Sequence, residues 1–329
     1  MNAKRVLITG AAGFIGSALA HHFDTHYKDI RVLALDKFRN NERFSNGNLK
    51  SFGHFKNLLG FRGEVIEADI NDPRTLEVIK DFAPDLIYHE AAISDTTVSE
   101  QDELVRTNVN AFLSLLSLCE KLGAHMVYAS SGATYGSAKA PQKVGEAEAP
   151  NNAYGFSKLA MDNAALSWSK RTGGVAVGLR YFNVYGKGEF FKERTASMIL
   201  QFGLQILRGT EPKLFEGSDK IYRDFVYIKD IIQANLKAAN ATKSGVYNVG
   251  TGVARSFSDV VDILQAEFGT NLKKSFIKNP FKSSYQFHTE ADIAPTILEL
   301  GYAPEYTLEQ GIKDYADEIR RIYAQEVLA

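Results

Sequence analysis

The chain has 329 residues, and its 38 Lys and Arg residues nearly balance its 39 Asp and Glu residues, giving a formal net charge of −1 at pH 7. A chain with this balance lacks the basic face that nucleic-acid binding requires, so we expect no nucleic acid as a partner. No apolar segment reaches the roughly 20 residues needed to cross a bilayer, which argues against a membrane protein.

The single cysteine, Cys119, excludes an internal disulfide and is typical of a reducing compartment. It lies in an apolar run, and we expect it to be a packed core residue rather than a nucleophile. No cluster of Cys and His residues indicates a metal site. The first predicted strand begins at residue 5, which leaves no room for a signal peptide, so we expect a soluble cytoplasmic protein.

Short apolar runs alternate with longer helical patterns over the first 180 residues. Strands are predicted at 5–9, 31–36, 64–67, 85–89, 126–130 and 175–180, and helices at 17–26, 74–82, 103–122 and 153–170. This alternation is typical of βαβ units, and it predicts an α/β fold with a doubly wound parallel sheet of the Rossmann type. Because buried parallel strands are continuously hydrophobic, we expect these runs to be covered on both faces.

After residue 180 the alternation ends, and glycines and aromatic residues become frequent around 185–191 and 215–222. A late strand at 245–249 is expected to return to the main sheet. We therefore expect residues 1–185 to form a nucleotide-binding Rossmann domain, to which residues 225–250 return. Residues 186–224 and 251–329 would form a smaller, discontinuous substrate-binding lobe over the carboxyl edge of the sheet, where open α/β sheets bind ligands.

A glycine pattern, Gly10-x-x-Gly13-x-x-Gly16, separates the first predicted strand from the first helix. Glycines at these places permit a tight turn, close approach of the backbone to a pyrophosphate, and close packing of helix on strand. The free N–H groups at the start of the helix favour phosphate binding. In this context the pattern predicts a dinucleotide-binding loop.

Residues at the end of the second strand bear on the choice between NAD and NADP. Asp36 lies about 20 residues beyond the glycine loop, where an acidic side chain bonds the adenosine ribose and favours NAD. Lys37, Arg39 and Arg43 follow at once, and these cations could hold a 2′-phosphate or simply be solvated. The residues alone leave the phosphate preference open.

Tyr154 and Lys158 are four residues apart in a predicted helix, so their side chains share one face. A free tyrosine has a pKa of about 10 and is a poor base at neutral pH. A nearby cation stabilises the phenolate and lowers this pKa. Alone, the pattern also fits a surface pair, and it is the glycine loop and the pair Ser130-Ser131 that favour a catalytic interpretation.

At this point the chain resembles the extended short-chain dehydrogenase/reductase family over nearly its whole length. The resemblance depends on the glycine loop, Asp69, His89-Glu-Ala-Ala92, Asn108, Ser130-Ser131-Gly-Ala-Thr-Tyr135-Gly136, Tyr154-x-x-x-Lys158, Arg180-Tyr-Phe-Asn183-Val-Tyr185-Gly186 and Arg223-Asp-Phe-Val-Tyr227. In that family the tyrosine exchanges a proton with a substrate hydroxyl, the lysine binds the nicotinamide ribose and lowers the tyrosine's pKa, and the serine orients the reacting oxygen. The resemblance implies these roles for Tyr154, Lys158 and Ser131.

The resemblance also implies a set of cofactor contacts, with NADP as the cofactor and NAD as the alternative. The implied residues are Gly10, Gly13, Phe14, Ile15, Gly16, Asp36, Lys37, Arg43, Asp69, Ile70, Glu90, Ala91, Ala92, Ser94, Asn108, Lys158, Val184 and Lys192.

A narrower resemblance is to the ADP-heptose 6-epimerase branch of this family, on the segments 181–192, 212–218 and 284–292. That branch oxidises C6 of an ADP-linked heptose and reduces it again on the opposite face, in the synthesis of lipopolysaccharide core precursors. The resemblance implies an ADP-sugar substrate, a homo-oligomer (a pentamer in that branch), and Lys192 as a second proton-transfer group. The implied substrate contacts are Asn183, Arg194, Gln201, Phe215, Glu216, Gly217, Ser218, Arg223 and Tyr285.

Several alternatives stay open. Lys192 could be a solvated loop charge, and the residues before it differ from the Gly-His pair usual in the branch; Arg223 could form an ion pair with Asp224. The activity could instead be that of a UDP-sugar 4-epimerase or a net reductase, or the chain could be a cofactor-sensing binding protein without chemistry. A dehydratase is disfavoured, because Gly132 and Ala133 occupy the places of that branch's Asp-Glu pair.

Overall fold

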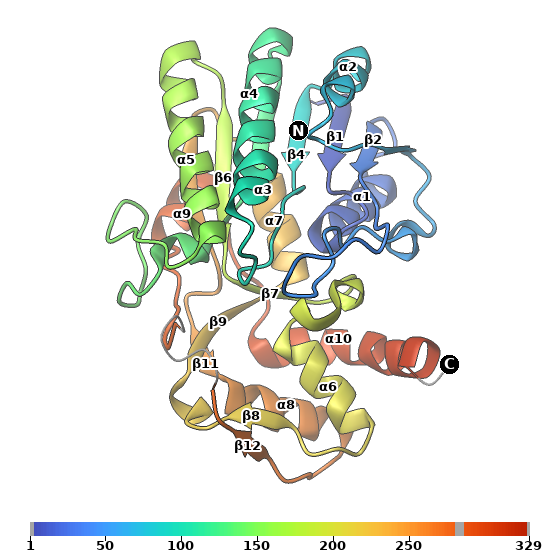
Figure 1. Cartoon of the computed structure of the whole chain (residues 1–329), viewed down its shortest axis with the longest axis vertical. Coiled ribbons are helices and arrows are strands. Elements are labelled where there is room, and N and C mark those ends of the chain that lie inside the picture. Colours follow the sequence, from blue (N-terminus) through green and yellow to red (C-terminus); the bar gives the residue numbers. More distant parts are fainter. Residues whose placement is uncertain (1–2, 280–285, 328–329) are drawn as a thin grey trace.

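The computed structural model describes residues 3–279 and 286–327, and its centre is a seven-stranded sheet in the order β10-β6-β5-β4-β1-β2-β3 (Figure 1). All neighbouring strands in this sheet run parallel. Its strands are β1 (Arg5–Thr9), β2 (Arg31–Asp36), β3 (Glu64–Glu67), β4 (Leu86–His89), β5 (His125–Ser131), β6 (Ala176–Tyr181) and β10 (Gly245–Val249). The predicted α/β fold with a doubly wound parallel sheet is confirmed.

Helices pack on both faces of the sheet and create two cores. One core joins the sheet to α1 (Phe14–His26) and α7 (Ile228–Ala238). The other joins it to α2 (Pro73–Phe82), α4 (Ala111–Leu122) and α5 (Ala153–Thr172). Cys119 is buried in this second core, as predicted, and burial raises the pKa of its thiol to about 12.

Two predicted elements differ from the structure in detail. The helix predicted over 103–122 is divided into α3 (Gln101–Leu104), a π-helical turn (Val105–Asn110) and α4. The third strand, β3, is not buried on both faces, because it lies at the edge of the sheet and Glu64 and Val65 are exposed. A strand with a neighbour on one side only is covered less than the central strands are.

The rest of the chain forms a smaller lobe at the carboxyl edge of the sheet, drawn in the lower part of Figure 1. It contains a three-stranded sheet of β7 (Asn183–Tyr185), β9 (Tyr222–Tyr227) and β11 (Ala254–Ser256), and a pair, β8 (Lys213–Phe215) with β12 (Ser275–Ile277). Its main helices are α6 (Met198–Leu207), α8 (Phe257–Phe268) and α10 (Leu308–Ile322), while α9 (Ala294–Leu300) packs near β10. Across both parts of the described chain, short 3-10 turns occur at Phe55–Leu58, Gly132–Tyr135, Phe190–Thr195 and Ser218–Lys220, and a last π-helical turn at Tyr323–Val327.

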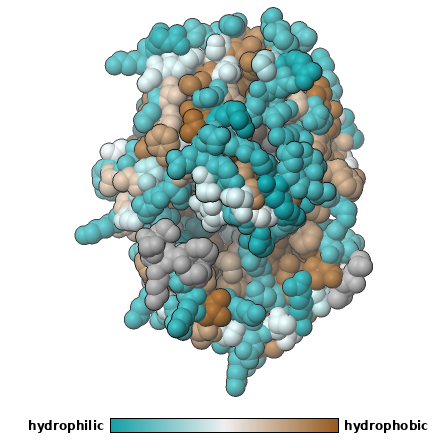
Figure 2. Space-filling model, viewed as in Figure 1, coloured by the Kyte–Doolittle hydropathy of each residue, from teal (hydrophilic) through white to brown (hydrophobic). Residues whose placement is uncertain are grey.

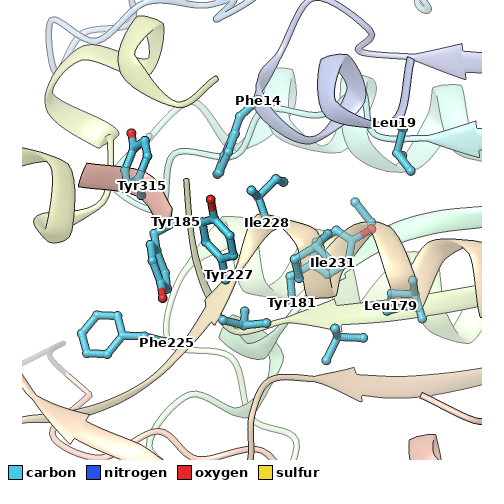
Figure 3. Close-up of a cluster of buried hydrophobic side chains, with 14 of the residues drawn as sticks. Phe14, Leu19, Leu179, Tyr181, Tyr185, Phe225, Tyr227, Ile228, Ile231 and Tyr315 are labelled. Atoms are coloured by element: carbon cyan, nitrogen blue, oxygen red, sulfur yellow. The ribbon is translucent and has the colours of Figure 1, made fainter. Parts of the chain in front are cut away.

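Aromatic side chains join the lobe to the main sheet. Figure 3 shows Phe14, Tyr185, Tyr227 and Tyr315 gathered where α1, β7, β9 and α10 meet. The rings of Tyr185 and Tyr227 are 5.3 Å apart, and the Tyr227 hydroxyl donates a hydrogen bond to Asp314 over 2.7 Å. Because one continuous core includes residues of both parts, the lobe has a fixed position over the carboxyl edge.

Hydrophilic side chains cover most of the face seen in Figure 2, and the apolar residues on it are scattered. Within the described ranges, no helix has the length and apolar character that crossing a membrane requires.

Candidate active site

A cleft of about 460 Å³ lies at the carboxyl ends of β1, β2, β4, β5 and β6. One wall comes from these strand ends, and the other comes from the lobe through residues such as Ser197, Met198, Phe225 and Phe257. Parallel strands gather their carboxyl ends at one edge, which is why segments far apart in the sequence meet here.

The glycine loop fits a dinucleotide phosphate group. Gly10 has φ +67°, and a Cβ there would lie 2.6 Å from the backbone N of Ala91, so no side chain is tolerated. A Cβ on Gly16 would lie 2.2 Å from the carbonyl oxygen of Gly10. Gly13 is the N-cap of α1 and makes no side-chain capping bond, which leaves the first N–H groups of the helix available to phosphate. Phe14 and Ile15 also line the cleft.

The Asp36 carboxylate is buried and is bonded by backbone N–H groups. It accepts hydrogen bonds from Ala12 over 2.9 Å and from Phe38 over 2.7 Å. Burial raises its pKa, and the backbone N–H groups oppose this effect. Asp36 thus links the end of β2 to the glycine loop, and it also lines the cleft.

Two lysines line the cleft beside Asp36. Lys37 pairs with Asp69 at 2.9 Å, and Lys50 pairs with Glu103 at 2.7 Å. Lys50 was not predicted from the sequence, because it belongs to no motif and reaches the cleft only through the loop after β2. Arg43, which was predicted to hold the cofactor, does not line the cleft and lies 3.3 Å from Glu193.

The segment after β4 supplies Glu90, Ala91, Ala92 and Ser94 to the cleft, and Asp69 and Ile70 after β3 line it as well. Glu90 accepts a hydrogen bond from the Tyr181 hydroxyl over 2.9 Å, and that hydroxyl accepts one from Asn235 over 2.8 Å. Burial raises the pKa of Glu90 to about 7, against the opposing effects of Tyr181 and Lys158. Tyr181 and Asn235 were not assigned to the site from the sequence.

Asn108 supports the site from behind and does not line the cleft. It is fully buried, accepts a hydrogen bond from the Ile93 N–H over 2.8 Å, and donates to the Ile93 carbonyl over 3.0 Å. It also donates to Ser157 over 2.9 Å, and Ser157 donates to the carbonyl of Tyr154 over 2.7 Å. Asn108 therefore ties the segment after β4 to the helix that carries Tyr154.

Tyr154, Lys158 and Ser131 all line the cleft. Asn152 caps α5 by accepting a hydrogen bond from Gly155 over 2.8 Å, which places Tyr154 in the first turn of the helix. The Lys158 ammonium lies 5.9 Å from the centre of the Tyr154 ring and donates to the carbonyl of Ala129 over 2.6 Å. Burial lowers the pKa of Lys158 to about 8, against the effects of Glu90 and Asp162.

The expected lowering of the Tyr154 pKa is not found. Burial raises this pKa, and the nearby Glu90 charge adds to the increase, while the hydrogen bond with Ser131 opposes it. The reason is that Tyr154 is largely buried and Lys158 directs its ammonium to a backbone carbonyl rather than to the phenol.

Lys192 also lines this cleft, and it lies in the short turn Phe190–Thr195. Its ammonium lies 5.8 Å from the centre of the Phe14 ring. Burial lowers its pKa, and the carboxylates of Glu189 and Asp95 oppose this effect. The geometry differs from that of a solvated loop lysine.

Of the predicted substrate residues, Asn183 lines the cleft, and so does its neighbour Val184. The remaining described ones do not line it: Arg194, Gln201, Phe215, Glu216, Gly217, Ser218 and Arg223. Gln201 donates to the carbonyls of Arg194 and Ala196, at the base of the Lys192 turn. Tyr285 lies outside the described residues.

Arg223 is buried close to the cleft. It donates to the Tyr222 carbonyl over 2.8 Å, and its guanidinium lies 5.7 Å from the ring centre of Phe257, a residue of the cleft wall. The Asp224 carboxylate accepts hydrogen bonds from the backbone N–H groups of Thr251, Gly252 and Ala291. The Asp224 carboxylate thus fixes the loop that follows β10.

A Rossmann sheet with a glycine loop, and a serine, tyrosine and lysine at its carboxyl edge, define a short-chain dehydrogenase/reductase fold. A family model described as the NAD dependent epimerase/dehydratase family matches residues 6–250, and the chain belongs to that family.

Three solved structures show the range of its relatives. ADP-L-glycero-D-manno-heptose-6-epimerase from Helicobacter pylori is 51% identical, with a TM-score of 0.88 and 96% of each chain covered. UDP-glucose 4-epimerase from Thermotoga maritima, solved with UDP-glucose, is 25% identical, with a TM-score of 0.85 over 96% of this chain and 99% of that one. UDP-glucuronic acid 4-epimerase from Bacillus cereus, solved with UDP-glucuronic acid and NAD, is 26% identical, with a TM-score of 0.82 over 97% and 100%.

Proposed function

We propose that this chain is an ADP-heptose 6-epimerase, which converts ADP-D-glycero-D-manno-heptose to ADP-L-glycero-D-manno-heptose through a transient ketone at C6. The observation that carries the proposal is the placement of two proton-transfer groups, Tyr154 and Lys192, on one cleft and on separate structural elements. Inverting a carbinol carbon requires the ketone to take up hydrogen on the face opposite to the one that lost it, and two proton-transfer groups allow its oxygen to be served in both orientations. The 51% identity to the Helicobacter pylori enzyme supports the choice of sugar.

A bound nicotinamide dinucleotide supplies the group that takes the carbon-bound hydrogen with its electron pair and returns it. The glycine loop and the start of α1 would hold its pyrophosphate, and the Lys158 ammonium would bond its nicotinamide ribose. We favour NADP over NAD, because Lys37 and Lys50 line the cleft beside Asp36 and would bind a 2′-phosphate. That phosphate would compete with Asp69 and Glu103 for the two lysines.

Tyr154 would accept the C6 hydroxyl proton of one epimer as it is oxidised, with Ser131 orienting the oxygen. Lys192, in its ammonium form, would then donate a proton to the ketone oxygen as the hydrogen returns to the opposite face of C6, and in the reverse direction the two groups exchange roles. Burial lowers the pKa of Lys192, so a larger fraction of its amine is free to act as a base near neutral pH. The cleft walls from both parts of the molecule would keep water away from the reacting carbon.

The division of labour between the two parts is also proposed. Within residues 1–185 and 225–250, the main sheet and its helices would hold the cofactor. The lobe, which includes β7 and β9, would enclose the sugar, with Asn183 at the reacting end and Arg223 near the diphosphate. By the same resemblance, the product would be a cytoplasmic precursor of lipopolysaccharide core, made by a homo-oligomer.

The test is to incubate the purified protein with ADP-D-glycero-D-manno-heptose, UDP-glucose and UDP-N-acetylglucosamine, with no added cofactor. We expect inversion of the ADP-heptose alone. Conversion of a UDP-sugar instead would make the chain a UDP-sugar 4-epimerase, and a requirement for stoichiometric external NADPH would make it a reductase.

Two further measurements check the route. In deuterated water the product should carry no deuterium at C6, because the same hydrogen returns to that carbon; solvent deuterium there would exclude the scheme. The nucleotide released on denaturing the protein should have the ultraviolet spectrum and mass of NADP, and a mass of NAD would overturn the roles given to Lys37 and Lys50.

A further inference from the structure

The segment that carries Lys192 is packed against the connection between β2 and β3. We call residues 186–195 the Lys192 segment and residues 37–63 the β2–β3 connection. The ring of His54 stacks on that of Phe191 with centres 3.7 Å apart and planes 3° from parallel. Asn57 donates one hydrogen bond to the Gly188 carbonyl and one to the Ala12 carbonyl, each over 3.1 Å. The Lys192 segment is therefore attached to the part of the molecule that carries the glycine loop.

Two arginines of the β2–β3 connection converge on Glu193, the residue that follows Lys192. The Glu193 carboxylate lies 3.7 Å from Arg39 and 3.3 Å from Arg43. Arg39 also donates to the Phe191 carbonyl and lies 5.7 Å from the centre of the Phe191 ring. The residues directly before and after Lys192, Phe191 and Glu193, are therefore both contacted by the β2–β3 connection.

The backbone of Glu193 is in a conformation that favours glycine. Its φ is +52° and its ψ is −124°, within an otherwise helical turn. A residue with a Cβ adopts such angles only when its surroundings hold it there. Both ion pairs of the Glu193 side chain lie at this point of the chain, directly after Lys192, whose ammonium lies in the cleft next to Phe14.

We propose that Glu193 is a positioning residue for Lys192, and that its ion pairs with Arg39 and Arg43 hold the Lys192 side chain in the cleft. Neither Glu193, Arg39 nor Arg43 lines the cleft, so all three act on the reaction through Lys192. The proposal gives Arg39 and Arg43 a role distinct from binding a cofactor phosphate. It rests on the proposed function only in taking Lys192 as a reacting group.

The first test measures Lys192 itself and needs no substrate. The protein is labelled with trace acetic anhydride over a range of pH, and the label on the Lys192 peptide is quantified by mass spectrometry. In the native protein Lys192 should titrate below an ordinary lysine. In Glu193→Gln, which keeps the shape of the side chain and removes its charge, Lys192 should leave the cleft and titrate at higher pH, so its labelling near neutral pH should fall. An unchanged labelling profile in Glu193→Gln overturns the proposal, whatever the turnover of that variant.

The second test measures turnover of the ADP-heptose. Glu193→Gln should lower kcat about tenfold, because small displacements of a reacting group are costly. KM should change by less than about twofold, since the substrate contacts remain. Arg39→Met should have a similar effect, Arg39→Lys should recover part of it, and the double variant Arg39→Met/Glu193→Gln should be no worse than either single one. Additive losses in the double variant would contradict a shared role.

The matched control is Glu77→Gln, which removes an exposed carboxylate paired with Lys80 at 3.2 Å on α2. It should leave both the labelling of Lys192 and the turnover at their native values. If the native protein does not convert the ADP-heptose, the proposed function fails, while the labelling comparison still decides whether Glu193 positions Lys192.

Discussion

The two groups proposed to move protons are held in different ways. Tyr154 lies in the first turn of α5, a 20-residue helix with an asparagine N-cap and a left-handed glycine at its C-cap. Lys192 lies in a six-residue 3-10 turn that Glu193 interrupts with non-helical angles. The backbone of Tyr154 is fixed by local hydrogen bonds, whereas the position of Lys192 depends on contacts such as that between Arg39 and Phe191, 152 residues apart.

Because the two groups are held differently, we expect mutations at their supports to affect stability and activity differently. The supports of Tyr154 are buried, and losing one of them should weaken the whole fold. The supports of Lys192 are partly exposed ion pairs and a ring stack, which contribute little to folding free energy. We therefore expect changes near Tyr154 to lower stability and activity together, and changes near Lys192 to lower activity alone.

The largest expected effects come from removing the reacting groups. Tyr154→Phe and Lys192→Met should each lower epimerisation by about 10²–10⁴-fold, the usual contribution of general acid–base groups. Each variant should retain half-reaction chemistry on an aldehyde analogue, because one proton-transfer group remains. The measurement is turnover with each substrate at saturating concentration. Normal epimerisation by Lys192→Met would remove the second group from the mechanism.

A pair of asparagines compares the two supports directly. Asn108→Ala leaves the buried N–H and carbonyl of Ile93 without their partner and should cost about 2–3 kcal/mol of unfolding free energy. Asn57→Ala removes the bond to Gly188 in the Lys192 segment and the buried bond to Ala12, and it should lower kcat several-fold with a smaller stability loss, about 1–2 kcal/mol.

Denaturant unfolding and turnover of both variants check this contrast. Asn240→Ala is the control, because Asn240 is exposed and donates to the carbonyl of Leu236 four residues earlier. A stable Asn108→Ala variant, or an Asn57→Ala variant that loses more stability than activity, would contradict the division of roles.

The same contrast explains what the sequence could predict. The strands, the glycine loop and the pairing of Tyr154 with Lys158 follow from hydrophobic periodicity and short spacing. Residues close together in the sequence determine their geometry, so the sequence alone predicts them. Lys50 and Asn235 belong to no motif, and Tyr181 lies in a motif that assigned it no role; their places in the site result from tertiary packing. Arg43 shows the reverse case: its sequence position suggested a cofactor phosphate, while its side chain pairs with Glu193.

The pKa values could not be predicted either, because burial dominates them. The sequence places a cation four residues from Tyr154 and so predicts a lowered pKa. In the structure the phenol is buried beside Glu90, and these two effects outweigh the bond with Ser131. Burial depends on how helix, strand ends and lobe enclose the residue, which spacing along the chain does not reveal.

Glu90→Gln should change the pH dependence of the Tyr154 side of the site. The Glu90 charge raises the pKa values of Tyr154 and Lys158, so removing it should let the phenol ionise at lower pH. We expect the pH–rate profile of the variant to shift to lower pH, with a change of about threefold in kcat at neutral pH. Unchanged profiles would show that Glu90 does not act on Tyr154.

The stability of the same variant has a defined sign. In the native state the pKa of Glu90 is raised to about 7 from its ordinary value of 4.5. Below pH 4.5 the carboxyl is protonated in both states, and as the pH rises to 7 only the unfolded chain loses the proton, so the contribution of Glu90 to stability is lost over this window. Glu90→Gln should therefore lose less stability than the native protein between pH 4.5 and 7. Parallel pH–stability curves would contradict the raised pKa.

The smallest expected effect is that of salt on the Lys192 side. The screening length falls from about 10 Å at 0.1 M salt to about 3 Å at 1 M, so exposed ion pairs weaken. The Glu193 side chain is 40% exposed and that of Arg43 is 45% exposed, whereas the Tyr154–Lys158 pair is buried. We expect kcat at saturating substrate to fall about twofold at 1 M salt in the native protein and to stay constant in Glu193→Gln. The half-reaction of Lys192→Met, which uses Tyr154 alone, serves as the control. Its rate should not respond to salt, because the buried contacts that support Tyr154 are not screened. An equal response of the native protein and Glu193→Gln would mean that salt acts elsewhere, and the ion pairs would then have no share in placing Lys192.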